Sequence, residues 1–248
     1  MRILIRVAYD GTRYSGWQIQ PNAITVEGEL RKAVSELFNK PIDLIGASRT
    51  DAGVHAKGNV AVFDVDTRIT PEKIAYALNS RLPEDIRVNY SAQVPDDFHP
   101  RHTDVVKTYE YSIYNATFMD PVKRLYSHFV YGKIDVNAMK KASEYLVGQH
   151  DFTSFCSAGT QVEDKVRIIY SIDVLQNDKN ITIRITGNGF LYNMVRIIAG
   201  TLLKAGTGAI EPEDMIKIIE GRDRQLAGPT APAKGLTLME IKYKELDK

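Results

Sequence analysis

The sequence predicts an α+β protein with a mainly antiparallel sheet of about eight strands and with helices on one side of that sheet. Three observations predict this class. Segments with alternating apolar residues indicate strands, segments with apolar residues at helical spacing indicate helices, and both kinds recur in one order in the two parts of the chain. That order is strand, helix, strand, strand, helix, strand, which is the split βαβ pattern of ferredoxin-like domains. We therefore expect two ferredoxin-like halves, residues 1–100 and 101–248, that form one continuous sheet with a cleft where they meet.

Six segments predict the first half. RILIRVAY is a strand that ends at an Asp-Gly turn signal. TVEGELRKAVSELFNK carries apolar residues at helical spacing, with Thr25 as the expected N-cap. Pro71 follows Thr70 and suits the first turn of a second helix. Strands are expected at about 43–48, at about 58–65 and over IRVNYSAQV.

The second half repeats this order. VVKTYEYSIYN is a strand, and VNAMKKASEYLVGQ is a helix with Asp135 as its N-cap and Gly148 as its C-terminal stop. KVRIIYSIDVLQ and NITIRITG are two strands joined by a polar turn. FLYNMVRIIAGTLLKAG is apolar nearly all round, so we expect a deeply buried helix. Glu211-Pro212 opens a further short helix, and GLTLMEIKYKEL is the last strand.

Length and composition narrow the possible classes of protein. The 248 residues, 44% of them hydrophobic, are sufficient for a sizeable core. Cys156 is the only cysteine, which excludes an internal disulfide and predicts a cytoplasmic protein. We expect neither a signal peptide nor a membrane span. Because the net charge is only +1, any surface that binds nucleic acid must gather its basic residues on one face.

The segment SRTDAGVHAK, residues 48–57, places chemically capable side chains in a connection between two predicted strands. Asp51 is a carboxylate that can act as a nucleophile or a general base. Arg49 lies two residues earlier, so in extended backbone both side chains face one ligand. The alternative is a solvated loop in which Arg49 and Asp51 form a weak surface ion pair.

His55 lies four residues after Asp51 and raises the alternative of a metal site. Metal sites generally need three or four ligands at recognisable spacing, and no second His or Cys cluster is near in the sequence. Phosphate-binding loops of the GxxxxGK[ST] and GxGxxG types are absent, as is a GxSxG elbow. The sequence therefore favours a reaction without a metal or a nucleotide cofactor.

Two residues in the second half are further candidates. Tyr109 alternates with a lysine on a strand, which suits stacking on an unstacked base beside a phosphate; the alternative is a buried core tyrosine. Arg196 lies within an apolar helix, where an unpaired guanidinium would be costly. Its expected partner is Asp51, or another acid such as Asp173 or Glu240.

Six motifs carry a resemblance to a known family. They are AYDGTRYSGWQIQ, SRTDAGVHAKGNVAVF, FHPRH followed by KTYEYSIYN, HDFTSF, FLYNMVRIIAGTL and AKGLTL, and they span nearly the whole chain. In this order they resemble the TruA family of tRNA pseudouridine synthases, for which RTDAGVHA is a highly specific signature.

The resemblance implies two ferredoxin-like halves around an RNA-binding cleft. It also implies isomerisation of uridine to pseudouridine at positions 38, 39 and 40 of the tRNA anticodon stem-loop, without cofactor or metal, by a homodimer. Asp51 would be the nucleophile that acts on a flipped-out uridine, and Arg49 would occupy the space that the base leaves. Tyr109 would stack on the target uracil. Arg196 would pair with Asp51, and Leu236 would belong to the apolar floor of the pocket.

Other functions stay open on the residues alone. The same fold could serve as a non-catalytic RNA-binding or RNA-folding module, or as a synthase with a different RNA target. A metal-dependent phosphodiesterase that uses Asp51 and His55 is a third possibility. Candidate contacts to RNA phosphates are Arg101, Lys123, Arg124, Lys140 and Lys141.

Overall fold

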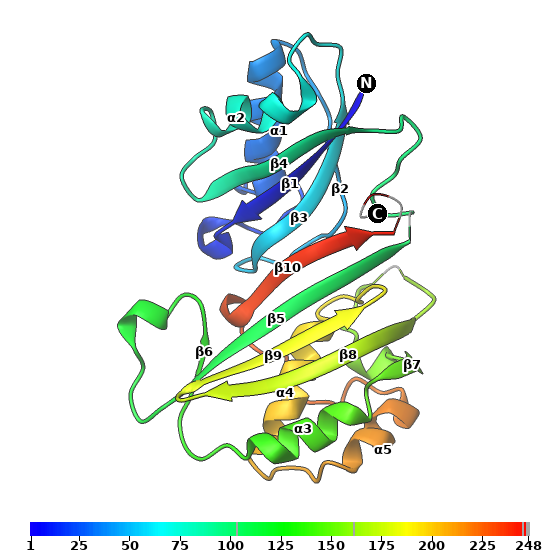
Figure 1. Cartoon of the computed structure of the whole chain (residues 1–248). Coiled ribbons are helices and arrows are strands. Elements are labelled where there is room, and N and C mark those ends of the chain that lie inside the picture. The colour runs from blue at the N-terminus through cyan, green and yellow to red at the C-terminus, as the bar shows by residue number, and fades with distance from the viewer. Residues whose placement is uncertain (103, 161, 245, 247–248) are drawn as a thin grey trace. The chain divides into compact units, whose positions relative to one another are not determined.

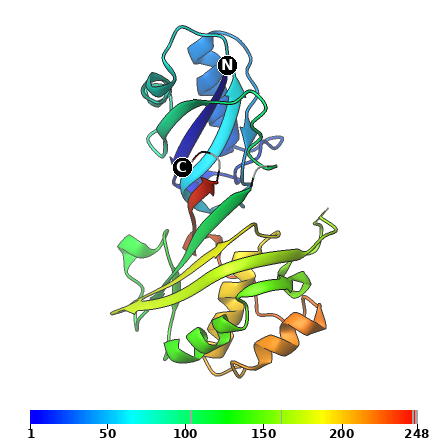
Figure 2. The same cartoon turned by 45° about the vertical axis from the view of Figure 1, so that its right-hand side comes forward.

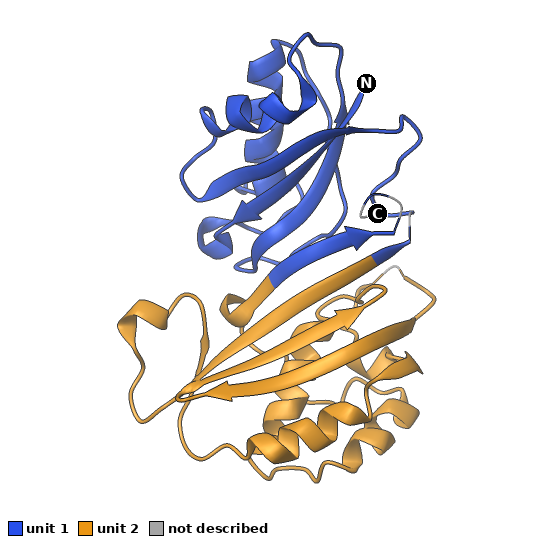
Figure 3. Ribbon diagram, in the orientation of Figure 1, with its two compact units in different colours: residues 1–105, 238–248 blue, residues 106–237 orange. Residues whose placement is uncertain are grey.

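The computed structural model describes the 248 residues apart from 103, 161, 245, 247 and 248. The chain forms two compact units, which Figure 3 distinguishes by colour: unit 1 comprises residues 1–105 and 238–248, and unit 2 comprises residues 106–237. The residues from 238 onward thus group with the N-terminal unit, whereas the expected division placed them in the second half.

Unit 1 has the element order of a ferredoxin-like half (Figure 1). Its antiparallel strands lie in the order β4-β1-β3, and β2 pairs with β3. Helix α2 packs against β4, and α1 packs against α2. These elements are β1 (Arg2–Tyr9), α1 (Val26–Phe38), β2 (Ile45–Gly46), β3 (His55–Asp64), α2 (Pro71–Asn79) and β4 (Ile86–Val94).

Local sequence explains why α1 forms where it does. Thr25 has extended backbone, and its hydroxyl oxygen accepts a hydrogen bond from the backbone N–H of Gly28 at 3.3 Å, which caps the helix. Leu30 and Val34 lie one turn apart and are fully buried, so the helix presents an apolar face to the core. Asn39 ends the helix in the left-handed conformation.

Unit 2 repeats this order with two additional short strands. Its antiparallel strands lie in the order β5-β9-β8-β7, and β6 pairs in parallel with β5. Figure 2 shows its helices grouped beside the long β8–β9 hairpin. The elements are β5 (Val105–Asn115), β6 (His128–Val130), α3 (Val136–Glu144), β7 (Gly148–Asp151), β8 (Val166–Asn177), β9 (Asn180–Gly187), α4 (Met194–Gly206) and α5 (Asp214–Gly221). Strand β10 (Leu236–Tyr243) begins in unit 2 and ends in unit 1.

The predicted burial of the long apolar helix is confirmed. Every residue of α4 is buried except Arg196 and Lys204. The helix starts at Met194, after Asn193 adopts the left-handed conformation with φ of 61°. Arg196 therefore lies in the first turn of the helix and is half-buried rather than enclosed in the core.

Several boundaries differ from the expected ones. Strand β2 has only two residues, and β3 begins at His55, so the second part of the SRTDAGVHAK segment already belongs to a strand. Helix α3 ends at Glu144, and Gly148 opens β7 instead of stopping the helix. Strand β6, with three residues, was too short to produce a pattern in the sequence.

The α+β class with mainly antiparallel strands is confirmed. The described residues contain ten strands, of which β2 and β6 lie beside the main path of the sheet. Within the same part of the chain, no helix has both the length and the apolar character needed to cross a membrane. The cleft where the halves meet stays a prediction.

Candidate active site

The loop between β2 and β3 in unit 1 presents the two predicted chemical groups. Arg49 is exposed and Asp51 is half-buried, while Ser48 and Thr50 are buried on either side of the arginine. The chain turns directly after the aspartate: the N–H of Val54 donates to the carbonyl oxygen of Asp51 at 3.1 Å. Within that turn Gly53 has φ of 78°, a conformation that favours glycine.

A buried cluster of hydrogen-bonded side chains holds this loop in place. The side chain of Asn59 is completely buried, and its amide nitrogen donates to the carbonyl oxygen of Ser48 at 3.0 Å and to the hydroxyl of Tyr9 at 3.2 Å. The same Tyr9 hydroxyl shares a hydrogen bond of 2.8 Å with the hydroxyl of Thr50. Strands β1 and β3 thus fix the residues immediately before and after Arg49.

The segment 11–17 packs against the other side of the loop. The N–H of Trp17 donates to the carbonyl oxygen of Thr50 at 3.0 Å. Gly16, with φ of 88°, approaches so closely that a Cβ there would lie 2.5 Å from that oxygen. A Cβ on Gly11 would lie 2.0 Å from the carbonyl oxygen of Val54. The glycines of the DGTRYSGW motif therefore allow two backbone segments to touch.

His55 takes part in the support of the loop. The N–H of Gly11 donates to its Nδ1 at 3.1 Å, and an Asp10 carboxylate oxygen lies 3.1 Å from the same atom. Nδ1 of His55 thus lies within hydrogen-bond distance of both the backbone of Gly11 and the carboxylate of Asp10. Among the described residues, no group of three or more His, Cys, Asp or Glu side chains could hold a metal ion.

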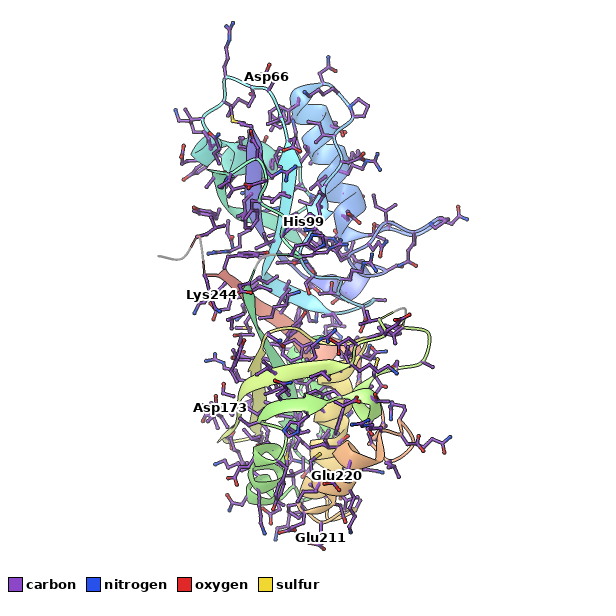
Figure 4. All side chains as sticks on the ribbon, turned by 90° about the vertical axis from the view of Figure 1, so that its right-hand side faces the viewer. Asp66, His99, Asp173, Glu211, Glu220 and Lys244 are labelled. Atoms are coloured by element: carbon purple, nitrogen blue, oxygen red, sulfur yellow. The ribbon has the colours of Figure 1, made fainter. Side chains whose placement is uncertain are left out.

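The FHPRH motif lies beside this loop in unit 1. His99 and His102 stack with ring centroids 3.9 Å apart, and the N–H of Arg101 donates to Nδ1 of His99 at 3.2 Å. The Nε of Arg101 donates to the carbonyl oxygen of Gly46, which belongs to the strand that leads into the loop. His99 and Lys244, labelled in Figure 4, belong to the wall of a cavity of about 580 Å³. Its lining residues are Pro95, Asp97, Phe98, His99, His102, Asp104, Lys244 and Leu246.

In unit 2, Tyr109 lies on β5 and is buried. Its ring meets the edge of Phe190 at a centroid distance of 5.2 Å and an interplanar angle of 82°. Lys107 is two residues away on the same strand and is half-buried, opposite Gly187 of β9. The burial is that of a core tyrosine, and the stacking role on a base stays a prediction.

Arg196 has a fixed orientation in unit 2. Its Nε donates to the carbonyl oxygen of Ala231 at 2.8 Å, and its Nη1 donates to the side-chain oxygen of Asn193 at 2.8 Å. The backbone N–H of Ala231 donates in return to the carbonyl oxygen of Arg196 at 3.1 Å. Leu236, buried as the first residue of β10, follows the same segment of the chain. The pairing of Arg196 with Asp51 stays a prediction.

Most of the candidate phosphate contacts have partners within the protein. Lys123 lies over the ring of Tyr114 at 4.8 Å and donates to Asn180 at 2.5 Å. Lys141 forms an ion pair with Glu213. Arg101 and Arg124 donate to the carbonyl oxygens of Gly46 and Pro121. Lys123 is half-buried, and the other four cations of the set are exposed.

The sequence identified the loop but not its supports. Tyr9 and Asn59 were missed, because each lies in a strand that reads as ordinary core. One signal was present: Asn59 is a polar residue at the start of an apolar strand segment, and buried polar side chains are normally hydrogen-bonded.

Comparison with known proteins identifies the class first. A family model described as tRNA pseudouridine synthase matches residues 5–102 and 142–244. The ranges contain the RTDAGVHA loop and the FLYNMVR segment, whereas Tyr109 lies between them. The chain is thus an isomerase of the pseudouridine synthase class.

Relatives define the family more closely. The chain is 46% identical to tRNA pseudouridine synthase A of Brevibacillus brevis over 242 residues, and 46% identical to that of Bacillus subtilis over 246 residues. A third relative, from Ruminiclostridium cellulolyticum, is 46% identical over 243 residues. Each alignment covers 98% of this chain and 99% of the relative. The chain belongs to the tRNA pseudouridine synthase family.

Proposed function

We propose that this chain isomerises uridine to pseudouridine at positions 38, 39 and 40 of the tRNA anticodon stem-loop, with Asp51 as the nucleophile and without a cofactor. Family membership supports the reaction and the substrate class. The observation that carries the assignment of the nucleophile is the loop itself. It holds a half-buried carboxylate two residues from an exposed arginine, on a backbone anchored by Tyr9, Asn59 and Trp17.

The chemistry needs a carboxylate and an exposed base. The N1–C1′ bond breaks, the uracil turns, C5 bonds to C1′, and the hydrogen of C5 leaves as a proton while N1 gains one. The target base must leave the helical stack, which costs on the order of a few kcal/mol. A carboxylate side chain is ordinarily ionised at neutral pH and needs no activating base. It attacks C1′ or C6, or removes a ribose proton, and these three routes stay alternatives.

The other candidate residues bind the substrate or support Asp51 in the proposed reaction. Arg49 occupies the space that the base leaves, because a guanidinium can fill that gap and bind phosphate together. Tyr109 stacks on the uracil, and Leu236 forms part of the apolar floor. Arg196 pairs with Asp51; its two fixed hydrogen bonds to Ala231 and Asn193 support a partner of constant orientation. The active enzyme is a cytoplasmic homodimer that binds the anticodon arm.

The test is tritium release from an unmodified tRNA transcript labelled at C5 of uridine, with chelator present and no cofactor added. We expect release with the unaltered protein and none above background with Asp51→Asn, while tRNA affinity changes less than about threefold. Asp66→Asn is the matched control, since it makes the same change at an exposed carboxylate of unit 1. Turnover by Asp51→Asn would refute the assignment of the nucleophile.

The same assay separates the alternative functions. Tight tRNA binding without any release would favour a non-catalytic RNA-binding module or another RNA target. Release that chelator abolishes would favour a metal-dependent mechanism. Mapping of the modified uridines in the product tests the positions 38, 39 and 40.

A further inference from the structure

Hydrogen bonds from a small set of buried side chains hold the loop that carries Asp51. The proposed reaction assigns no role to these side chains. Asn59 is 0% exposed, and both hydrogens of its amide group are used, one on the carbonyl oxygen of Ser48 and one on the hydroxyl of Tyr9. Its amide oxygen accepts from the N–H of Val60 at 2.9 Å. A buried polar cluster with every member bonded favours one conformation, because any rearrangement leaves an unsatisfied group.

The cluster acts on two points of the loop that bracket Arg49. Asn59 donates a hydrogen bond to the carbonyl oxygen of Ser48, and Tyr9 shares one with the hydroxyl of Thr50. The carbonyl oxygen of Thr50 is also held, by the N–H of Trp17. Thr50 is therefore fixed at both its side chain and its main chain, one residue before Asp51.

We infer that Tyr9, Asn59 and Thr50 are positioning residues for catalysis: they set the direction of the Asp51 carboxylate and of the Arg49 side chain without touching the substrate. This inference rests on the proposed function of Asp51. Both strands are needed to position the loop, because Tyr9 belongs to β1 and Asn59 belongs to β3. The hydroxyl of Tyr9 links the two strands by its hydrogen bond with Asn59. Misplacement of a reacting group by about 1 Å can lower a rate by about a hundredfold.

The two ends of the Tyr9–Thr50 bond can be removed separately. Tyr9→Phe deletes one hydroxyl and keeps the ring that packs 5.9 Å from Trp17. Thr50→Val deletes the other hydroxyl at nearly constant volume, whereas Thr50→Ser keeps it. We expect Tyr9→Phe and Thr50→Val each to lower kcat at least about tenfold while KM for tRNA changes less than about threefold. Thr50→Ser should recover most of kcat. The double variant should be little worse than Tyr9→Phe alone, since Tyr9→Phe already removes the bond to Thr50 as well as the bond from Asn59.

The measurement is kcat and KM from tritium release, with the thermal midpoint of each variant recorded in parallel. Tyr76→Phe is the matched control, because that tyrosine is 79% exposed on α2. Wild-type kcat in both Tyr9→Phe and Thr50→Val, whatever their midpoints, would overturn the inference and leave the cluster a purely structural role. If one of the two does not fold, the other reports on the same bond.

Asp51→Asn, assayed beside these variants, separates the two proposals. Turnover by Asp51→Asn defeats the proposed function and with it the basis for a positioning role. An inactive Asp51→Asn together with fully active Tyr9→Phe and Thr50→Val defeats the positioning role alone.

Discussion

Arg101 donates a hydrogen bond from its Nε to the carbonyl oxygen of Gly46 at 2.7 Å, and so ties the FHPRH segment to the strand that leads into the Asp51 loop. Although Arg101 is exposed as a residue, its guanidinium is partly buried, which lowers its pKa, and the positive charge of Arg49 lowers the pKa further. Arg49 therefore opposes the charged form of Arg101 through like-charge repulsion. A phosphate group placed between or beside them would relieve that repulsion.

This arrangement predicts that Arg101 contributes to tRNA affinity. We expect Arg101→Gln to weaken binding and to reduce the slope of log Kd against log salt by roughly one unit, the share of one lost phosphate contact. Filter binding or fluorescence anisotropy at several salt concentrations gives the slope. Arg81→Gln, at an exposed position after α2, serves as the control and should leave the slope unchanged. An unchanged slope in Arg101→Gln would mean that its role is confined to holding Gly46.

The close approach of Gly16 to the loop predicts a large effect of one added methyl group. In Gly16→Ala the backbone φ of 88° costs about 1–2 kcal/mol for a residue with a Cβ, and the clash with the Thr50 carbonyl oxygen at 2.5 Å adds to that cost. We expect a loss of more than about 2 kcal/mol in the free energy of unfolding. Activity should fall with it, because Thr50 must move.

Gly132→Ala is the matched control for this prediction. Gly132 has φ of 93°, but nothing lies within 4 Å of a Cβ built there. It should show the backbone cost of about 1–2 kcal/mol alone, with normal kcat. Urea denaturation of both variants gives the comparison, and equal losses in the two would show that the contact with Thr50 relaxes without cost.

Sequence patterns predicted the elements whose residues alternate or repeat over several turns. VVKTYEYSIYN coincides with β5, and Asp135 caps α3 by accepting from the N–H groups of Asn137 and Ala138. Strand β2 was overestimated, because Ile42 and Leu44 are buried and apolar yet lie outside any regular strand. Burial alone produces the same pattern as strand pairing over such a short run.

The chemistry of the loop was predictable, while its support was not. Arg49 and Asp51 are recognisable by residue type and spacing. The bond between Asn59 and Tyr9, in contrast, joins residues 50 positions apart. Asn59 pairs with Val7, next to a register irregularity between Val7 and Tyr9 in the pairing of β1 with β3. No local pattern encodes such a register, since it follows from tertiary packing.

A last prediction concerns acid stability. His128 on β6 is half-buried beside the ring of Tyr111, and burial lowers its pKa from the ordinary value of 6.5, with a smaller contribution from the positive charge of Lys234. Between the folded and the unfolded pKa, the unfolded chain binds more protons than the folded protein. Stability from this source is therefore complete above pH 6.5 and declines as the pH falls toward the folded pKa.

The comparison of variants isolates this contribution. His99 in unit 1 shifts in the same direction, through burial first and then through the charges of its neighbours His102 and Arg101. His128→Gln removes one titrating group at similar size, so its urea midpoint should depend less steeply on pH between 8 and 5 than that of the wild type. The urea midpoint of His128→Gln at pH 8, compared with that of the wild type, measures the packing cost of the substitution by itself. His99→Gln should flatten the dependence separately, and the double variant should be flatter than either, because the two histidines lie in different units. Parallel curves for His128→Gln and the wild type would contradict the assignment of acid sensitivity to this histidine.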